Sequence, residues 1–180
     1  PIGGAAGLFN LDQVELSYLD LTGTLTIGNE TQTKGTLRMQ DMDMRAGGYN
    51  VALHAGEVVS EGAFQAGGQV FVTAADGHMR FHGPVSAQGT GNSIILASMN
   101  GNVDVPALDP GDGRFLVYTG SVANSRLRGI YGGARKQLSA SYGAPAPGDV
   151  PGAQSAIFFR DQGSSVADVL DVRTSLAPIQ

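Results

Sequence analysis

The sequence predicts an all-β protein: a right-handed parallel β-helix, or solenoid, with a C-terminal β elaboration. Glycine supplies 27 of the 180 residues, about twice its usual share of roughly 7%. Three segments look alike, because each is an apolar strand that ends in a glycine turn: 50–56 (NVALHAG), 70–77 (VFVTAADG) and 94–101 (IILASMNG). Their closing glycines recur about every 21 residues, with further short strand segments between them. Such a unit of three short strands per repeat is typical of a β-helix coil.

The composition excludes several classes of protein. A hydrophobic content of 42% with a formal net charge of −5 argues against a disordered chain, and the acidic balance argues against binding to nucleic acid. The chain has no cysteine, so it holds neither a disulfide scaffold nor a zinc–thiolate site. Apolar runs such as Ile94–Ala97 are too short to cross a bilayer, so no membrane insertion is expected.

The N-terminal segments are less regular than the central repeats. Residues 8–19 fit a strand or a short helix equally well and are expected to cap the coils or to continue an upstream coil. Residues 21–27, 35–39 and 41–45 alternate apolar and polar side chains with period 2, which predicts strands of one or two early coils. Residues 1–105 are therefore assigned to β-helix coils.

Within the central repeats, alternation predicts which side chains point inward. Two further sets of strands follow the first: 58–62, 79–83 and 103–105, then 63–68 and 84–89. Val70 and Val72 should share one face with Phe71 on the other, and Met79 and Phe81 should face away from Arg80. Left-handed backbone is expected at the glycines that end the strands, since glycine adopts it at low cost; these are Gly56, Gly62, Gly77, Gly83, Gly89 and Gly101.

The period is lost near Pro106. A turn cluster at 109–113 precedes a strong strand at 114–119, and looser segments follow at 129–133 and 138–143. A Pro/Gly loop at 144–152 leads to a second strong strand at 156–160, and 166–172 fits a helical turn or a strand. Residues 106–180 are therefore predicted to be a strand and loop elaboration that packs on the solenoid.

The same C-terminal residues resemble a known family. Glycine-turn coils, then GRFLVYTG at 113–120, a loop, Tyr142-Gly143, a strand with two phenylalanines and SLAP at 175–178 are similar to a stretch of the filamentous haemagglutinin-like adhesins of two-partner secretion. Phe115 replaces the tryptophan usual at its position. The resemblance implies a secreted or cell-surface bacterial protein that acts in adhesion, biofilm or filament formation, without catalysis.

Two histidines could begin a metal site. His78, Arg80 and His82 alternate along one predicted strand, which places both imidazoles on the same side of the strand. The sequence supplies no third ligand, so an exposed polar face is the favoured interpretation and no metal is predicted.

Acidic residues suggest two other kinds of site. Asp104, Asp109 and Asp112 surround a Pro-Gly turn, where calcium ligation competes with Asx-turn and capping roles that need no ion. A polysaccharide hydrolase or lyase needs paired carboxylates, and the candidates on strands or turns are Asp41, Asp43, Glu57 and Glu61. Candidate aromatic residues for sugar stacking are Tyr118, Tyr131, Tyr142, Phe158 and Phe159.

The function expected from these observations is a non-catalytic structural or adhesive module. No catalytic, cofactor-binding or metal-binding residue is predicted. The solenoid ends must be capped or must stack on flanking coils or on other copies; candidate interface residues are Leu8, Phe9, Ile157, Phe158 and Phe159. The expected partners are the chain itself and surface glycans. The alternatives are a polysaccharide-active enzyme on the same fold and an antiparallel β-sandwich with a carbohydrate-binding face.

Overall fold

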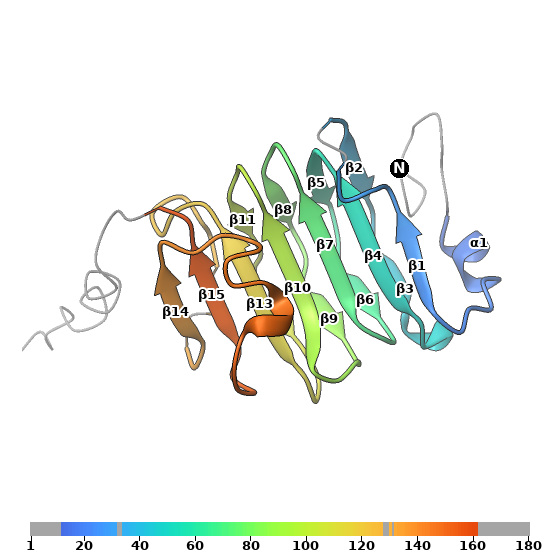
Figure 1. The fold of residues 1–180 in the computed structure, drawn as a ribbon. Helices are drawn as coiled ribbons and strands as arrows, with labels where there is room; N and C mark the ends of the chain where they lie inside the picture. The colour runs from blue at the N-terminus through green and yellow to red at the C-terminus, as the bar shows by residue number, and fades with distance from the viewer. Residues whose placement is uncertain (1–11, 32–33, 128–129, 131, 162–180) are drawn as a thin grey trace, which may run out of the picture.

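The computed structural model describes residues 12–31, 34–127, 130 and 132–161, and these form a right-handed parallel β-solenoid of about six coils (Figure 1). Three sheets run along it. Sheet 1 contains, in spatial order, β1 (Thr24–Ile27), β4 (Asn50–Ala55), β7 (Val70–Ala74), β10 (Asn92–Ser98), β13 (Arg114–Thr119), β15 (Ala156–Phe159) and β14 (Arg135–Leu138). Sheet 2 contains β2 (Thr36–Met39), β5 (Glu57–Ser60), β8 (Met79–Phe81) and β11 (Val103–Asp104). Sheet 3 contains β3 (Met42–Met44), β6 (Phe64–Ala66), β9 (Val85–Ala87) and β12 (Leu108–Asp109).

The register confirms the predicted repeat. Val58 pairs with Met79 and Phe64 with Val85, so the same position recurs 21 residues later in the next coil. Each of the first four coils contributes one strand to each sheet, and all the pairings between the named strands are parallel. The alternative of an antiparallel sandwich is therefore wrong.

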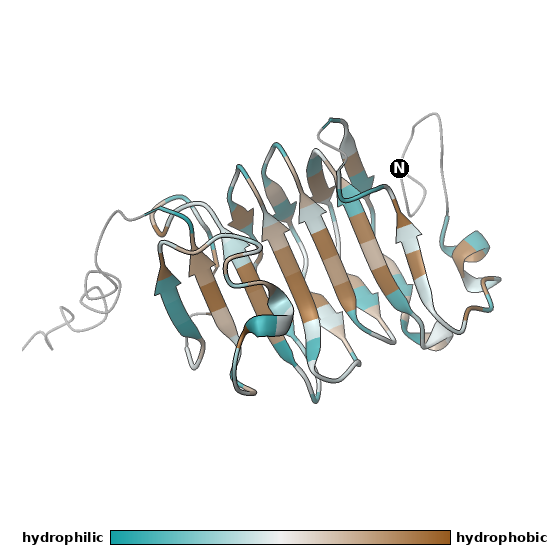
Figure 2. Cartoon of the chain, viewed as in Figure 1, coloured by the Kyte–Doolittle hydropathy of each residue, from teal (hydrophilic) through white to brown (hydrophobic). Residues whose placement is uncertain are grey.

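The core consists of stacked rows of inward side chains. In sheet 3, Met42 pairs with Phe64 and Phe64 with Val85, and each is at most 2% exposed. Met79 and Phe81 are likewise buried, whereas Arg80 is exposed, so the predicted alternation is confirmed. The inner strands of sheet 1 are apolar along much of their length, whereas β14 at its end is mostly polar (Figure 2); parts of both faces of the inner strands are covered.

The prediction of left-handed backbone at the turn glycines is wrong. None of the six glycines predicted to be left-handed has a positive φ; the positive values lie elsewhere, for example at Gly48 and Gly91. The reason for glycine is close stacking of coils. A Cβ on Gly83 would lie 2.5 Å from the backbone nitrogen of Ala63, and one on Gly101 would overlap the carbonyl of Gly77. Equivalent turns thus meet backbone to backbone, with no room for a side chain.

A short helix covers the N-terminal end of the coils. The helix α1 (Gln13–Ser17) begins with a capping box in which the Asp12 side chain accepts from Glu15 N and the Glu15 side chain accepts from Asp12 N. Leu16 is 2% exposed and belongs to the core. The Gln13 side chain bonds both the backbone N–H and the carbonyl of Asp43, so it takes the place of a further strand beside β3.

The C-terminal end of sheet 1 departs from sequence order. β15 lies between β13 and β14 and is parallel to both, although β14 precedes it in the chain. The pairing of β12 with β9 and of β13 with β10 continues the stack beyond Pro106. Among the described residues, sheets 2 and 3 gain no strand after β11 and β12, so the three-sided regularity ends there.

The connection from β14 to β15 forms a strap, residues 139–155, across the outer face of sheet 1; it includes the 3-10 helix η2 (Pro147–Asp149) (Figure 1). The strap and the outer face of sheet 1 together form a second apolar cluster; its members are Ala97, Leu116, Tyr118, Ala140, Val150, Ala156 and Phe158. Arg114 is 8% exposed and donates to the Asn92 side chain and to strap carbonyls, including that of Val150 at 2.8 Å. The strap explains why the strands beneath it are apolar on both faces.

Candidate functional site

The two strand histidines considered for a metal site do not converge on one another. His82 Nδ1 lies 2.8 Å from a carboxylate oxygen of Glu61, and His78 Nδ1 accepts the backbone N–H of Asn102 at 3.1 Å. Arg80, between them, is paired with Glu57 at 3.0 Å. Each side chain of this group therefore contacts a neighbouring coil. Within the described residues, no group of three or more His, Asp or Glu side chains is arranged to hold a metal ion.

The three aspartates around the Pro-Gly turn are also separate. The Asp109 side chain accepts the backbone N–H of Gly111 at 3.2 Å, which is the predicted Asx turn. Asp104 lies on sheet 2, in a backbone bridge with Arg126. The Asp109 assignment is confirmed, and the turn needs no ion to explain it.

The four carboxylates considered for acid–base chemistry are all used in contacts within the solenoid. The Asp41 side chain accepts the backbone N–H of Ala63 at 2.7 Å, Glu57 pairs with Arg80, and Glu61 contacts His82. Asp43 forms a fork-like ion pair with Arg45 at 2.6 Å. Hydrogen bonds from the Arg45 side chain and backbone, together with its positive charge, lower the pKa of Asp43 to about 2, so Asp43 is a poor proton donor at neutral pH.

Several aromatic residues form a row on the outer face of sheet 1. His54 of β4 contacts Phe71 of β7 edge to face at 5.2 Å between ring centroids, and Phe71 lies 6.0 Å from Tyr142 of the strap. Tyr142 contacts Tyr118, which stacks on Phe158 of β15 at 4.6 Å. The row crosses the strands and joins the strap to the solenoid.

The row is a packing element, because its members are largely covered. Burial raises the pKa of Tyr118 to about 12, and the Tyr118 hydroxyl donates to the Pro145 carbonyl at 3.0 Å. Burial also lowers the pKa of His54, whose Nδ1 lies 2.8 Å from the Thr73 hydroxyl. Phe158 and Phe159 are at most 1% exposed. These rings offer little surface for sugar stacking; Tyr131 lies outside the described residues.

The predicted interface strand is interior to this chain. Ile157, Phe158 and Phe159 are at most 1% exposed, and β15 is paired on both edges. Among the described residues, β14 is the last strand of sheet 1 at this end and β1 the last at the other. Leu8 and Phe9 lie outside the described residues. The predicted interface at all five positions stays a prediction; in the part of the chain that the structure describes, sheet 1 ends with the outer edges of β14 and β1.

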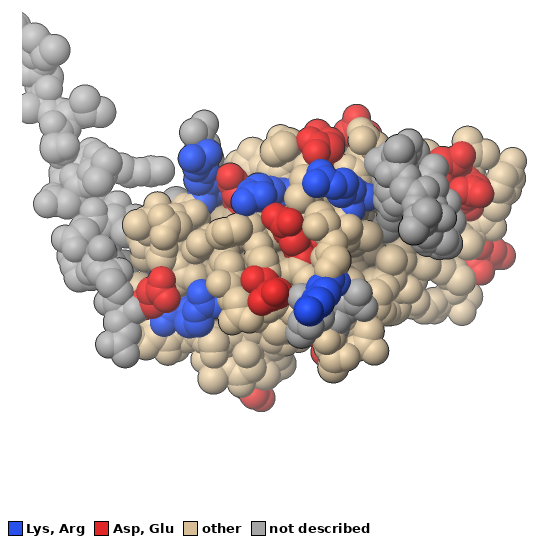
Figure 3. Space-filling model, turned by 90° about the horizontal axis from the view of Figure 1, so that it is seen from above, with Lys and Arg blue, Asp and Glu red and all other residues tan. Residues whose placement is uncertain are grey.

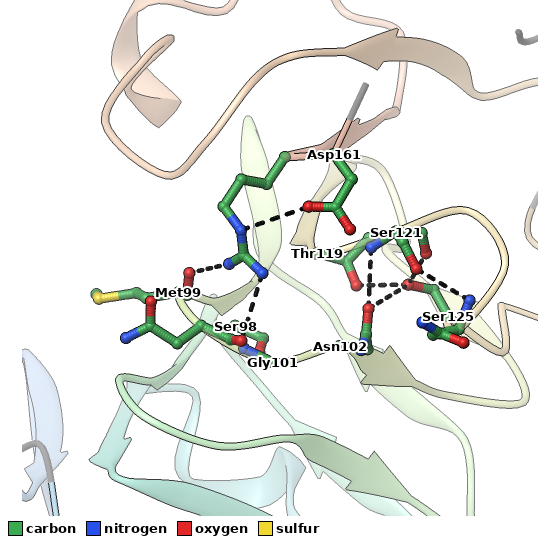
Figure 4. Close-up of polar contacts among 11 residues, drawn as sticks. Ser98, Met99, Gly101, Asn102, Thr119, Ser121, Ser125 and Asp161 are labelled. Atoms are coloured by element: carbon green, nitrogen blue, oxygen red, sulfur yellow. Dashed lines mark hydrogen bonds and ion pairs between the residues drawn. The ribbon is translucent and has the colours of Figure 1, made fainter. Parts of the chain in front are cut away.

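A polar network secures the C-terminal corner of the solenoid (Figure 4). The Asn102 side chain accepts the Ser121 backbone N–H at 2.9 Å, and the hydroxyls of Thr119 and Ser125 are 2.7 Å apart. Thr119 Oγ1 also accepts the backbone N–H of Val103 at 2.8 Å. Arg160, at the end of β15, donates to the carbonyls of Met99 and Asn100 in the turn after β10. These contacts hold the last strands in place and leave no unpaired buried polar atom among the described side chains.

Two exposed surfaces remain as places for contact with other molecules. Along the outer face of sheet 2, Arg38 lies 4.0 Å from Glu61 and Arg80 lies 3.0 Å from Glu57. Seen from above, positive and negative side chains alternate on this side with no large area of one sign (Figure 3). The second surface is an open groove of about 740 Å³ on the outer side of sheet 3, next to α1. Sequence reasoning did not predict the groove, because it requires α1, β3 and β6 to meet.

No family model, curated protein or solved structure matches the chain. The resemblance to filamentous haemagglutinin-like adhesins consequently stays a prediction from the sequence. Across the part of the chain that the structure describes, no helix has the length and apolar character needed to cross a membrane.

Proposed function

We propose that this chain is a non-catalytic structural or adhesive module of a secreted bacterial surface protein. The observation that carries the proposal is the use of outer polar side chains to join successive coils. Glu57 to Arg80, Glu61 to His82 and Asp41 to the backbone of Ala63 each connect residues 21 to 23 positions apart. Such a stack behaves as a stiff rod with a solvated surface, which suits a protein that presents surfaces at a distance.

A secreted location and an adhesive role also draw support from the sequence resemblance. The described side chains along the outer face of sheet 2 carry both positive and negative charges, which suits a surface exposed to the medium. Antibodies raised against the purified chain test the location: labelling of intact bacteria from the native source, or of their culture medium, is expected. Signal restricted to lysed cells would contradict an extracellular role.

The alternative is a polysaccharide-active enzyme on the same fold. Its best carboxylate pair is Asp41 and Asp43, which both line the groove beside sheet 3. Such an enzyme needs one carboxyl group whose pKa is raised so that it can donate a proton, and the pKa of Asp43 is shifted in the opposite direction. Asp43 is therefore not that acid, and hydrolysis in this groove would require Asp41 as the proton donor.

Incubation with neutral and acidic polysaccharides separates the two functions. The expected result is no new reducing end and no new unsaturated end, measured by a colorimetric reducing-sugar assay and by ultraviolet absorbance. Turnover that disappears in Asp41→Asn would establish the enzyme and contradict the non-catalytic module. In parallel, binding of the chain to immobilised polysaccharides and to host or bacterial surfaces measures adhesion.

Self-association is the second part of the proposal. A copy whose β1 paired with β14 of the next copy would extend sheet 1, and because such contacts do not close, they generate a filament. Electron microscopy of the purified chain is expected to show rods that shorten when Thr26→Pro removes a backbone donor that faces away from β4, on the outer edge of β1. A monodisperse monomer at all concentrations in the wild-type protein would rule out assembly through these edges.

A further inference from the structure

The groove beside sheet 3 is built by four parts of the chain. Gln13 comes from α1, Asp43 from β3 and Gln65 from β6, and Gln88 follows β9. A second depression of about 340 Å³ adjoins it, since both are lined by Gln13, Asp43 and Ala46. Together they form one surface, here called the N-terminal groove, which extends from the third coil to the end of α1.

Unused hydrogen-bonding groups face this groove. Across the described residues, no hydrogen bond engages the side-chain amide of Gln65 or Gln88, although nearby polar groups such as Gln13 and Asp41 are bonded. A side-chain amide offers two donors and one acceptor. Arg45 is held in place by its pair with Asp43, so its remaining donors are oriented in advance. Preoriented amide and guanidinium groups suit a ligand rich in hydroxyls.

An exposed aromatic ring lies in the adjoining depression. Tyr18, at the end of α1, is 80% exposed and lines the second depression. It contrasts with the buried rings on sheet 1, and an exposed aromatic face beside hydrogen-bonding groups is a platform on which a sugar ring can pack. Ala46 and Ala63 also line the groove, and their small side chains leave space for a ligand.

Charge restricts the class of ligand. Asp43 and Arg45 neutralise each other, which leaves Asp41 in the groove and Asp20 in the adjoining depression as further negative charges. Uronic acids and sulfated sugars would be repelled by them. An uncharged glycan would not.

We propose that the N-terminal groove binds a neutral oligosaccharide, whose hydroxyls are bonded by Gln65, Gln88 and Arg45 and one of whose rings packs on Tyr18. This inference deepens the proposed adhesive function and rests on it. It names both the surface and the ligand class: an uncharged, polyhydroxylated glycan several sugars long.

Affinity electrophoresis of the full chain tests the proposal. Native gels contain dextran, galactomannan or a soluble β-glucan as neutral probes, and polygalacturonate or heparin as acidic probes. We expect retardation by at least one neutral probe. The double variant Gln65→Ala/Gln88→Ala is expected to bind it about tenfold more weakly, as the loss of two hydrogen-bonding groups predicts.

Tyr18→Ala should weaken binding to a similar extent, whereas Tyr18→Phe should retain it because the ring remains. Gln137→Ala removes an exposed glutamine from β14 at the opposite end of the solenoid and is the matched control, expected to bind like the wild type. Urea midpoints confirm that each variant is folded; the substituted side chains are all at least partly exposed.

The remaining outcomes overturn the inference. Two results would place adhesion on another surface and leave the adhesive function intact. One is retardation by acidic probes alone; the other is binding of a neutral probe that the double variant leaves unchanged. Absence of retardation by every probe also rejects the groove. The proposed function itself fails on a different readout, the polysaccharide turnover described above.

Discussion

At Gly101, the lack of a side chain lets two coils approach at backbone distance. A Cβ there would meet the carbonyl of Gly77, and one on Gly77 would lie 3.3 Å from the carbonyl of Gly56. The three turns thus form a column in which the backbone of each glycine contacts the turn of the preceding coil. The recurring glycines predicted the turns correctly, but the reason for them is the spacing between coils and not a left-handed backbone.

Gly101→Ala should therefore destabilise the protein. Because the neighbouring atoms are backbone, the coils must separate locally, and overpacking of this kind costs about 1–3 kcal/mol. Urea unfolding measures the loss. Gly148→Ala is the matched control, since nothing lies within 4 Å of a Cβ at Gly148 and its φ is not positive. Equal stability of the two variants would show that the column does not limit the spacing of the coils.

At Asp43, a single neighbouring residue determines the titration. Hydrogen bonds from Arg45 lower the pKa of the carboxyl group from 3.8 to about 2, so the pair stabilises the folded state above pH ~4 and this contribution is lost as the pH falls through about 2. Both side chains are about half exposed, so the effect on stability is small. A carboxyl-detected NMR titration should give a midpoint near 2 for Asp43 and a higher midpoint in Arg45→Gln; an unchanged midpoint would contradict the role of Arg45.

At the scale of the elements, the strap and the helix α1 cover surfaces that the coils leave open. In each case one polar side chain makes hydrogen bonds to backbone groups that no strand pairs. Arg114 of β13 donates to carbonyls of the strap, and Gln13 of α1 bonds the backbone of Asp43 at the edge of β3. A capping-box signature, Asp12-x-x-Glu15, marks the start of α1 in the sequence. That signal would have distinguished the helix from the strand that residues 8–19 fitted equally well.

Arg114→Lys tests the anchoring of the strap. Lysine keeps the charge but loses the planar fork that reaches Asn92 and several carbonyls at once, and the loss of charge-assisted hydrogen bonds in a buried position predicts a decrease of about 2 kcal/mol in the free energy of unfolding. Limited proteolysis should then cleave within residues 139–155. Arg126→Lys, at an exposed position beside β11, is expected to resemble the wild type; equal protection of the strap in both variants would contradict the anchoring role.

At the scale of the whole molecule, a solenoid couples each coil to its neighbours alone, so stability should vary along its length. The strands β7 and β10 are paired on both sides and almost wholly buried on their inner face, whereas β1 and β14 each end sheet 1. Hydrogen exchange should be slowest in β7 and β10 and fastest in β1 and β14. Uniform exchange along the chain would instead indicate a single cooperative unit.

The sequence by itself determined the parallel coils, the three strands per repeat and the inward and outward sides of strands such as β8. These follow from a period of about 21 residues and from alternation within each strand, and both are local patterns. The strand at 114–119 was predicted, but its pairing with β10, and that of β12 with β9, was not, because the repeat weakens beyond Pro106 while backbone pairing continues.

The tertiary structure alone decided the insertion of β15 between β13 and β14, the burial of Phe158 under the strap, and the meeting of Gln13, Gln65 and Gln88 in one groove. Each of these joins residues far apart in the chain, and no local pattern encodes which of two later strands pairs first with the edge of β13. The high glycine content depends on both the sequence and the tertiary structure. The spacing of the glycines is visible in the sequence, but its physical cause, contact between neighbouring backbones, exists only once the coils are stacked.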